Sequence, residues 1–200
     1  EEFRKNIPGT EEDPSFWASG ISVVAHMKNP KIAAAHFNTR YIVTSSKSWF
    51  GGGCDLTPAI PEKTETENFH TGLKRTLDLH DQKYYPKFKN ECDEYFYLKH
   101  RKEPRGIGGI FFDYLNNDHF EKDLNLIKDV GQFFANFIIS NTNSKKDLTY
   151  DSDDLKKLSH KRSRYVEFNL LHDRGTLFGL KTGGNIDAIL MSMPPEAKWE

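Results

Sequence analysis

Two segments near the start of the chain alternate between apolar and polar residues with the period of two that a β-strand shows. The first, SGISVVAHM, spans residues 19–27, and the second, AAAHFNTRYIV, spans residues 33–43. The second segment turns His36, Asn38 and Arg40 to one face. The sequence therefore predicts two strands, one of which carries a polar ladder with a step of about 7 Å.

Three helices are predicted in the middle of the chain. Thr64 and Glu67 fit a capping box, which predicts a helix that begins there and continues to about His80. Residues 86–100 predict a second helix, and residues 118–140 carry apolar side chains at the spacing of a third. Between them, the segment RGIGGIFFD predicts a glycine-rich turn that leads into a short strand.

The last third of the chain is predicted to return to β-structure. RYVEFNLLHDRG, TLFGLKTGG and NIDAILMSMPP together cover residues 164–195 and are interpreted as consecutive strands, with turns at 173–175 and 183–185. This order of strands, helices and strands lacks the βαβ alternation of a parallel sheet. We therefore expect one α+β domain over residues 1–200, with a large, mainly antiparallel sheet flanked by helices on both faces.

Composition narrows the class of protein. The 200 residues suit one domain, and no run of 18 apolar residues predicts a membrane span. The formal net charge of -1 argues against a general nucleic-acid binder, which would carry a basic excess. Phenylalanine occurs 15 times, which indicates either a thick core or a pocket for a flat apolar ligand. The spacing of Cys54 and Cys92 is not that of a clustered site, and it favours a reducing compartment.

The segment WFGGGCDLTP at residues 49–58 places Asp55 close behind three glycines. Glycine lets a ligand or another backbone segment approach closely. Two interpretations stay open: a tight turn that Asp55 caps, or a site where an anion or a ring meets the backbone. No Gly-Lys-Ser/Thr sequence follows, so this is not a phosphate loop. A second glycine-rich segment begins at Arg105 and would suit a phosphate or carboxylate, although a solvated turn is commoner.

The eight histidines form neither an HExxH motif nor the spacing of a zinc site. Four of them, His26, His36, His70 and His100, lie next to segments with buried patterns. Each one alone is better explained as a hydrogen-bonded structural histidine than as a ligand. Pattern alone thus predicts an α+β domain, with a polar ladder and a glycine-flanked acid, that could bind an aromatic polyanion.

Several long strings together resemble the oxygen-dependent coproporphyrinogen III oxidase family. They are HFNTRY, WFGGGCDLTP, YYPKFKNECDEYFYLKHRKEPRGIGGIFFD and RYVEFNLLHDRGTLFGLKTGG, followed by ILMSMPP and KWE, and the resemblance covers about residues 16–200. It implies an enzyme of haem biosynthesis that converts coproporphyrinogen III to protoporphyrinogen IX. Two propionates lose CO₂ and become vinyl groups, with O₂ as the electron acceptor and peroxide as the by-product.

The resemblance also implies roles for individual residues. Asp55 corresponds to the family aspartate proposed to hold the pyrrole N–H proton, Arg40 to an arginine that pairs with a propionate, and His36 to the proton donor. The segment from Tyr165 to Trp199 corresponds to the part that forms the family's homodimer. The positions that correspond to substrate-binding residues are Ser22, Asn38, Thr39, Arg40, Gly183, Gly184 and Asn185.

The resemblance implies no obligatory cofactor beyond O₂, which is a co-substrate. In some bacterial members, histidines that correspond to His26, His36, His70 and His100 are assigned as ligands of a divalent metal such as Mn²⁺, whereas other members work without metal. Either these histidines bind an ion, or they serve as acid–base and structural groups, which is the interpretation we favour. The expected partners are coproporphyrinogen III, O₂ and a second copy of the chain, with no nucleic acid.

Three features depart from the family pattern. Ser48 replaces the first Trp of WWFGGG, Asn185 stands where many members have arginine, and family members extend further at both ends, so we expect a fragment. Two alternatives are an inactive tetrapyrrole-binding domain and a metal-dependent oxygenase of an unrelated substrate. The expected location is the cytoplasm for a bacterial protein and the mitochondrial intermembrane space for a eukaryotic one.

Overall fold

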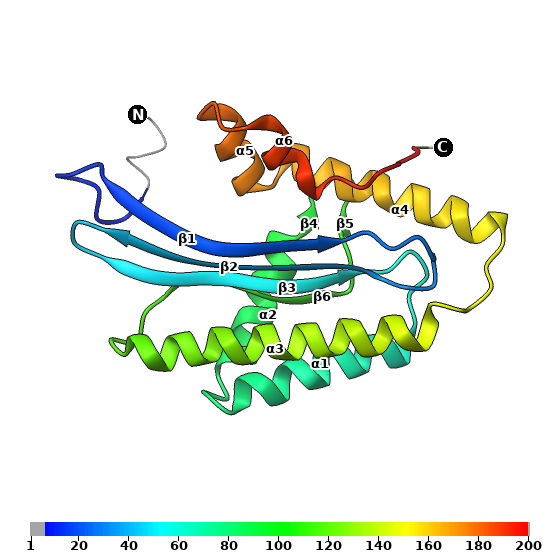
Figure 1. Cartoon of the computed structure of the whole chain (residues 1–200), viewed down its shortest axis with the longest axis horizontal. Helices are drawn as coiled ribbons and strands as arrows, with labels where there is room; N and C mark the ends of the chain where they lie inside the picture. The colour runs from blue at the N-terminus through cyan, green and yellow to red at the C-terminus, as the bar shows by residue number, and fades with distance from the viewer. Residues whose placement is uncertain (1–6, 200) are drawn as a thin grey trace.

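The computed structural model describes residues 7–199 and places an antiparallel sheet between two layers of helices (Figure 1). The sheet has the strand order β1-β2-β3-β6, and every neighbouring pair is antiparallel. The predicted α+β class is confirmed. The strands are β1 (Phe16–Ala25), β2 (Ala34–Thr44), β3 (Ser48–Thr57) and β6 (Gly108–Leu115), and a separate hairpin pairs β4 (Tyr97–Leu98) with β5 (Glu103–Pro104).

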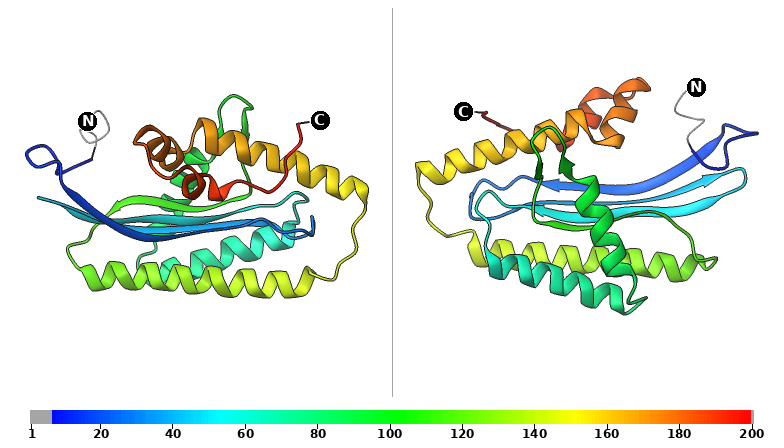
Figure 2. Two further views of the ribbon diagram at one scale, coloured as in Figure 1. Left: turned by 45° about the horizontal axis from the view of Figure 1, so that its top comes forward. Right: turned by 180° about the vertical axis from the view of Figure 1, so that it is seen from behind.

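Helices cover both faces of the sheet. One layer holds α1 (Lys63–Asp78) and α3 (Phe120–Lys145), below the sheet in Figure 1. The other holds α4 (Ser152–Leu171), α5 (Arg174–Lys181), α6 (Ile186–Ile189) and the short 3₁₀ helix η2 (Leu190–Ser192). Helix α2 (Tyr84–Tyr95) packs against β6 and joins the two layers at that edge (Figure 2). We call the two sides of the sheet the α1–α3 face and the α4–α5 face.

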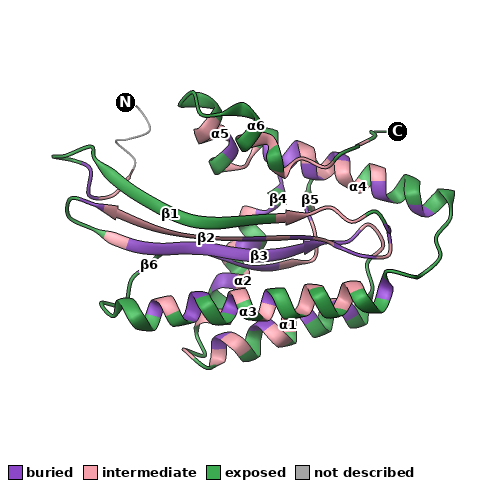
Figure 3. Cartoon of the chain, viewed as in Figure 1, coloured by how far each residue is buried: buried purple, intermediate pink, exposed green. Residues whose placement is uncertain are grey.

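The alternation of side chains along the strands divides the core between the two faces. Phe37, Leu56 and Phe112 pack with the apolar side of α1 and α3, which is the larger of the two clusters. Phe111 points the other way and packs with Phe168 of α4. Strand β3 is buried along most of its length, whereas the edge strand β1 is exposed over residues 16–23 (Figure 3). The many phenylalanines therefore serve mainly to build the core on both sides of the sheet.

The strands predicted over residues 164–195 are wrong, because this region is helical. In α4 the buried Leu158, Tyr165 and Phe168 are seven and three residues apart, which is the period of a helix. The residues expected to form hairpin turns instead mark helix starts, since Asp173 caps α5 and Asn185 caps α6. Asp and Asn favour both turns and caps because their side chains accept hydrogen bonds from nearby backbone N–H groups.

Two helix boundaries also differ from the prediction. The capping box at Thr64 is wrong, since α1 begins after Glu62 and no side chain caps it. The helix predicted over residues 86–100 ends at Tyr95, and the β4–β5 hairpin follows. Along residues 7–199, none of the helices combines the length and the apolar character that crossing a bilayer requires.

Candidate functional site

The three glycines form the centre of the sheet, so the interpretation of this segment as a turn is wrong. Gly51, Gly52 and Gly53 lie in β3, paired with β2 on one side. A Cβ on Gly53 would come within 2.3 Å of the carbonyl oxygen of Ile110 in β6. A Cβ on Gly51 would come within 2.9 Å of the Arg40 guanidinium. Glycine is needed here because neighbouring strands and a charged side chain approach the backbone too closely for any larger residue.

Asp55 lies opposite His36 in the β2–β3 register, and the two side chains meet. The distance from His36 Nδ1 to Asp55 Oδ1 is 2.8 Å. Arg105 donates from Nη2 to both carboxylate oxygens of Asp55, at 2.7 and 2.6 Å. Asp55 and Arg105 are each only 1% exposed, so this is a buried charged cluster.

The charge of this cluster follows from its contacts. Burial acts to raise the pKa of Asp55, but Arg105 and His36 outweigh it and hold the pKa of that carboxyl below its ordinary value. Asp55 is therefore an ionised carboxylate. Since it is 1% exposed and both of its oxygens are engaged, it has no free surface for a ligand in this conformation.

Three aromatic rings surround the guanidinium of Arg105. Its Cζ lies 3.9 Å from the ring centre of Phe96, 4.5 Å from that of Tyr165 and 4.8 Å from that of Phe168. Arginine suits such a site because its planar cation stacks on aromatic faces and is weakly hydrated. Burial raises the pKa of Tyr165 to about 12, so this ring stays neutral. The C-terminal end of α2 and the last third of α4 thus hold Arg105 against Asp55.

A second charged group lies further along the same face of the sheet. Arg40 Nη2 is 2.9 Å from Asp113 Oδ2, and Arg174 Nη2 is 3.8 Å from the same oxygen. The guanidinium of Arg174 also lies over Tyr95, 4.9 Å from the ring centre. Two arginines share one carboxylate, which leaves one positive charge in excess. Arginine holds carboxylates in a two-pronged geometry, so this group suits an incoming acid side chain.

Asn38 lies between the two charged groups on the ladder of β2. Its Oδ1 is buried and has no hydrogen-bond partner in the described part of the chain. Ser22 of β1 lies directly opposite Asn38 in the register and shares its face. The expectation that Thr39 contacts the ligand beside Asn38 and Arg40 needs a correction. Alternation along β2 puts the Thr39 side chain on the α1–α3 face, away from those two residues. The ladder therefore consists of His36, Asn38 and Arg40, as the alternation of the sequence predicts.

The four histidines considered as metal ligands each have their own partners. His26 Nε2 is 2.9 Å from the carbonyl oxygen of Ser192, and burial lowers the pKa of this histidine. His70 uses both ring nitrogens, one with the Ile107 carbonyl at 2.9 Å and one with a tyrosine hydroxyl. His100 also uses both, with Glu167 at 2.7 Å and with a second imidazole.

These contacts test whether the predicted metal set fits an ion. Over residues 7–199 no group of three or more His, Cys, Asp or Glu side chains has an arrangement that could hold a metal ion. His70 and His100 would each have to give up a hydrogen bond to bind a metal. The predicted set, His26, His36, His70 and His100, therefore does not fit one shared ion, and no step of the chemistry below is assigned to a metal.

The turn at Gly183, Gly184 and Asn185 has local contacts. Gly183 has a φ of 73°, a conformation that favours glycine, and Asn185 accepts hydrogen bonds from two backbone N–H groups at the start of α6. Gly184 N donates to the carbonyl oxygen of Gly179. Among the described residues, no hydrogen bond joins this turn to the ladder. Its predicted contact with substrate stays a prediction.

Three charged residues of the site were missed as site residues by the sequence analysis. Arg105 follows Asp55 by fifty positions, and its glycine-rich segment looked like a solvated turn. The sequence predicts Arg174 in a hairpin turn and Asp113 at the end of a short strand. No local pattern links these residues to β2 and β3, because their partners come from other elements.

The α4–α5 face of the sheet therefore has a buried acid–histidine pair near one end, a flat strip of glycines in the middle and an excess positive charge further along. This arrangement suits a class of protein that binds a broad anionic ligand, with a histidine–aspartate pair of the kind that transfers protons. The chain matches the family described as Coproporphyrinogen III oxidase over residues 1–200, and it belongs to that family. The family predicted from sequence motifs is thus confirmed.

Curated relatives agree with this assignment. The chain is 59% identical over 198 residues to the oxygen-dependent coproporphyrinogen-III oxidase of Rickettsia rickettsii (strain Sheila Smith). The matched region is 99% of this chain and 71% of the relative. The chain is 57% identical over 197 residues to the protein of the same name from Rickettsia bellii (strain OSU 85-389), which covers 98% of this chain and 70% of the relative.

Proposed function

We propose that this chain catalyses the oxygen-dependent conversion of coproporphyrinogen III to protoporphyrinogen IX in haem biosynthesis. Membership of the family and the names of its relatives support the reaction. The observation that carries the proposal is that His36, paired with Asp55, and Arg40, paired with Asp113, lie on the same face of one strand. Arg40 lies four positions after His36, which corresponds to about 13 Å along a strand. This is the scale of a macrocycle with acid side arms rather than of a single small ring.

The reaction balances with O₂ as the only oxidant. Each reacting propionate, written R–CH₂–CH₂–COO⁻, combines with O₂ and one proton to give R–CH=CH₂, CO₂ and H₂O₂. The bond to the carboxyl carbon breaks, a hydrogen leaves the carbon next to the ring, and two electrons pass to O₂. The protein must therefore hold the carboxylate, orient the pyrrole and handle protons.

The residues of the face divide these tasks. Arg40 holds the propionate, with Arg174 adding a second positive charge nearby. Asn38 offers an unpartnered buried oxygen, which accepts the pyrrole N–H. Ser22 lines the same face across from Asn38.

His36 is the proposed proton-transfer group, and Asp55 acts through it. Asp55 accepts from Nδ1 of His36, so in the neutral imidazole Nε2 is the acceptor that remains. This assignment changes the direct contact between Asp55 and the pyrrole that the sequence suggested, because Asp55 is only 1% exposed and both of its oxygens are engaged. Asp55 is thus a positioning residue, and Arg105 keeps it ionised.

Aerobic incubation with coproporphyrinogen III tests the function, with the vinyl product followed by fluorescence after oxidation. General acid–base groups contribute about 10²–10⁴ in rate, so His36→Gln should lower kcat at least 10²-fold. Asp55→Asn should also lower kcat and change the pH–rate profile, since it alters how His36 is protonated. His80→Gln is the control, because His80, two residues after the end of α1, forms a histidine–aspartate pair with Asp129 of α3, outside the face. Parent-like turnover in both site variants would contradict the assignment, and tetrapyrrole binding without vinyl product would favour the inactive alternative.

We further propose that the chain forms a homodimer through the segment from Tyr165 to Trp199. Several large apolar side chains of this segment are 40% or more exposed. They are Leu170, Leu171, Leu180, Ile186 and Met191. Exposed apolar side chains of this kind are expected where a second protein chain covers the surface. Sedimentation of the whole protein at the mass of one chain would contradict this. The proposed location is the cytoplasm, as expected for a bacterial protein; the relatives named above are bacterial, and cell fractionation would test the location.

A further inference from the structure

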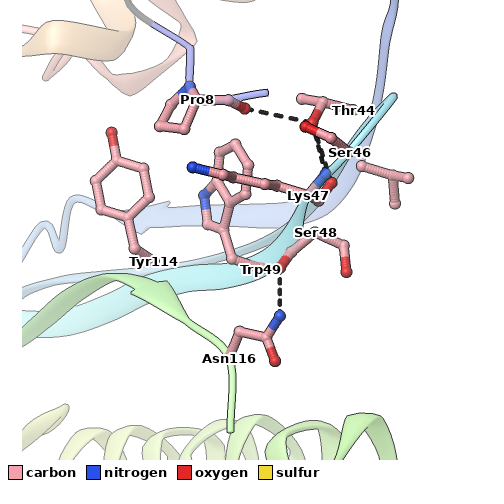
Figure 4. Close-up of a pocket in the computed structure, with 9 residues that line it drawn as sticks. Pro8, Thr44, Ser46, Lys47, Ser48, Trp49, Tyr114 and Asn116 are labelled. Carbon is pink, nitrogen blue, oxygen red and sulfur yellow. Dashed lines mark hydrogen bonds between the residues drawn. The ribbon is translucent and has the colours of Figure 1, made fainter. Parts of the chain in front are cut away.

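A pocket of about 580 Å³ opens at the turn between β2 and β3, beyond the charged groups of the site. Its walls include Val43 and Lys47 near that turn, Trp49 of β3, and Tyr114 and Asn116 from the end of β6. Figure 4 shows Trp49 and Tyr114 standing side by side on the side of the sheet away from α3. The pocket is therefore open on the α4–α5 face, where His36 and Arg40 also lie.

The pocket continues the face described above. In the β2–β3 register, Ile42 pairs with Trp49, which is two residues past the pairing of Arg40 with Gly51. Two residues along a strand correspond to about 7 Å on the same face. Tyr114 directly follows Asp113, the partner of Arg40. A ligand held by Arg40 is thus close enough to the pocket for one of its side arms to reach into it.

Two polar groups in the pocket point to a ligand with a negative charge. Trp49 is only 5% exposed, yet its Nε1 has no hydrogen-bond acceptor among residues 7–199. In Figure 4 this nitrogen is turned toward Tyr114. A buried N–H without a partner is rare and unfavourable, so an acceptor from outside the described chain is expected.

Lys47 supplies the charge. It is exposed, and among the described residues no carboxylate lies within ion-pair distance of its amine. Figure 4 shows its side chain extending from the turn toward Trp49 and Tyr114. A carboxylate at this position would accept from the indole N–H and pair with the ammonium, while the two rings cover its apolar stem.

We propose that this pocket binds a carboxylate-bearing side arm of the macrocycle that does not react. The proposal rests on the proposed function, since it extends the binding of the same ligand. It assigns Lys47 and Trp49 to binding and not to chemistry. Substitutions there should therefore weaken binding of substrate and transition state equally, which raises KM and leaves kcat unchanged.

The probe is coproporphyrin III, the oxidised and non-reacting form of the substrate, titrated into the whole protein with its fluorescence as the readout. Lys47→Gln should raise Kd about threefold to tenfold and should reduce the dependence of Kd on salt, because one charge pair is lost. Lys47→Arg should restore most of the affinity. Trp49→Phe keeps a ring but removes the N–H, and it should weaken binding by a similar factor.

Lys128→Gln is the matched control, because it removes the same charge from an exposed position of α3, on the opposite side of the sheet. Urea midpoints of all variants check that the fold is intact. If Lys47→Gln and Lys128→Gln give the parent Kd and KM while the parent forms vinyl product, the pocket has another role and the inference fails. If Lys47→Gln weakens binding but the parent forms no vinyl product, the inference stands and the proposed function fails.

Discussion

At the scale of single residues, the site depends on one buried ion pair. Arg105 and Asp55 are both almost fully buried, and each satisfies the charge of the other. A buried pair of this kind need not add stability over an apolar pair, but loss of one partner leaves an uncompensated charge. The pair thus fixes where the His36 imidazole lies and makes the cluster sensitive to single substitutions.

Arg105→Gln should lower the free energy of unfolding by about 3–5 kcal/mol, because it leaves Asp55 without its cation. Urea denaturation measures this as a lower midpoint at an unchanged slope. Arg101→Gln is the control, since Arg101 also forks onto a carboxylate, that of Glu167, but its side chain is 39% exposed. Its loss should cost about 1 kcal/mol or less. Equal losses in the two variants would show that the Asp55 pair does not carry a buried charge.

The pKa of Asp55 gives a direction for pH dependence. Its value in the folded chain is below the unfolded value of about 3.9, so its contribution is complete well above that pH. The contribution is lost as the pH falls through the lower, folded value. The free energy of unfolding should therefore decrease as the pH is lowered from about 5 to about 2. Asp55→Asn should be less stable at neutral pH and should show a smaller acid dependence. An unchanged acid slope in that variant would contradict the shift.

At the scale of elements, the middle strand and the fourth helix decide the geometry. Strand β3 brings Asp55 opposite His36, and α4 provides two of the rings around Arg105. The sequence predicted β2 and its ladder correctly, because alternation with period two is a local signal. It predicts strands in place of α4, because Tyr165, Val166 and Phe168 are residues typical of strands, although buried residues of α4 recur at helical spacing.

Helix α4 begins at a capping box that should have a measurable effect. Asp151 accepts from the backbone N–H groups of Asp153 and Asp154, and the Asp154 side chain accepts from the backbone of Asp151. Asp151→Ala should lower the free energy of unfolding by about 1 kcal/mol, seen as a shift of the urea midpoint. Asp147→Ala, an exposed acid before the helix, should leave it within about 0.5 kcal/mol. A loss no larger than that of the control would argue against the cap.

Two glycines should respond in opposite directions to the same change. Gly53→Ala places a Cβ 2.3 Å from a backbone carbonyl of β6, so it should destabilise by about 1–3 kcal/mol. Gly131→Ala places a Cβ in the middle of α3 at 3.4 Å from the nearest atom, an ordinary contact. It should stabilise by up to about 1 kcal/mol, because alanine favours a helix over glycine. Thermal or urea midpoints would give both signs, and a stabilised Gly53→Ala would show that β3 and β6 can separate.

At the scale of the whole molecule, two layers of helices enclose the sheet, and each buries one thiol. Cys54 lies in the cluster under α1 and α3, and Cys92 in the cluster under α4. Both are free and fully buried, and burial raises the pKa of each thiol well above its ordinary value. The two cysteines therefore report on the two layers separately.

Both thiols should react with a thiol reagent only when the whole fold opens, because each is closed off by its own layer. Labelling rates measured against urea concentration should follow the unfolding curve with one common dependence for both sites. Mass spectrometry of the two cysteine-containing peptides distinguishes them. Early labelling of Cys92 alone would show that the α4 layer opens by itself, and it would contradict a single cooperative unit.

The sequence by itself determined the family, the α+β class and the ladder of His36, Asn38 and Arg40, because long motifs and period-two alternation are local properties of the chain. Only the tertiary structure decided that Asp55 is closed off by Arg105, that Arg174 joins Arg40 at Asp113, and that the end of the chain is helical. These facts depend on residues from distant elements sharing one low-dielectric space, where burial and pairing set the charge of each group. A local sequence pattern does not show which distant residues meet in that space, so it could not predict these contacts.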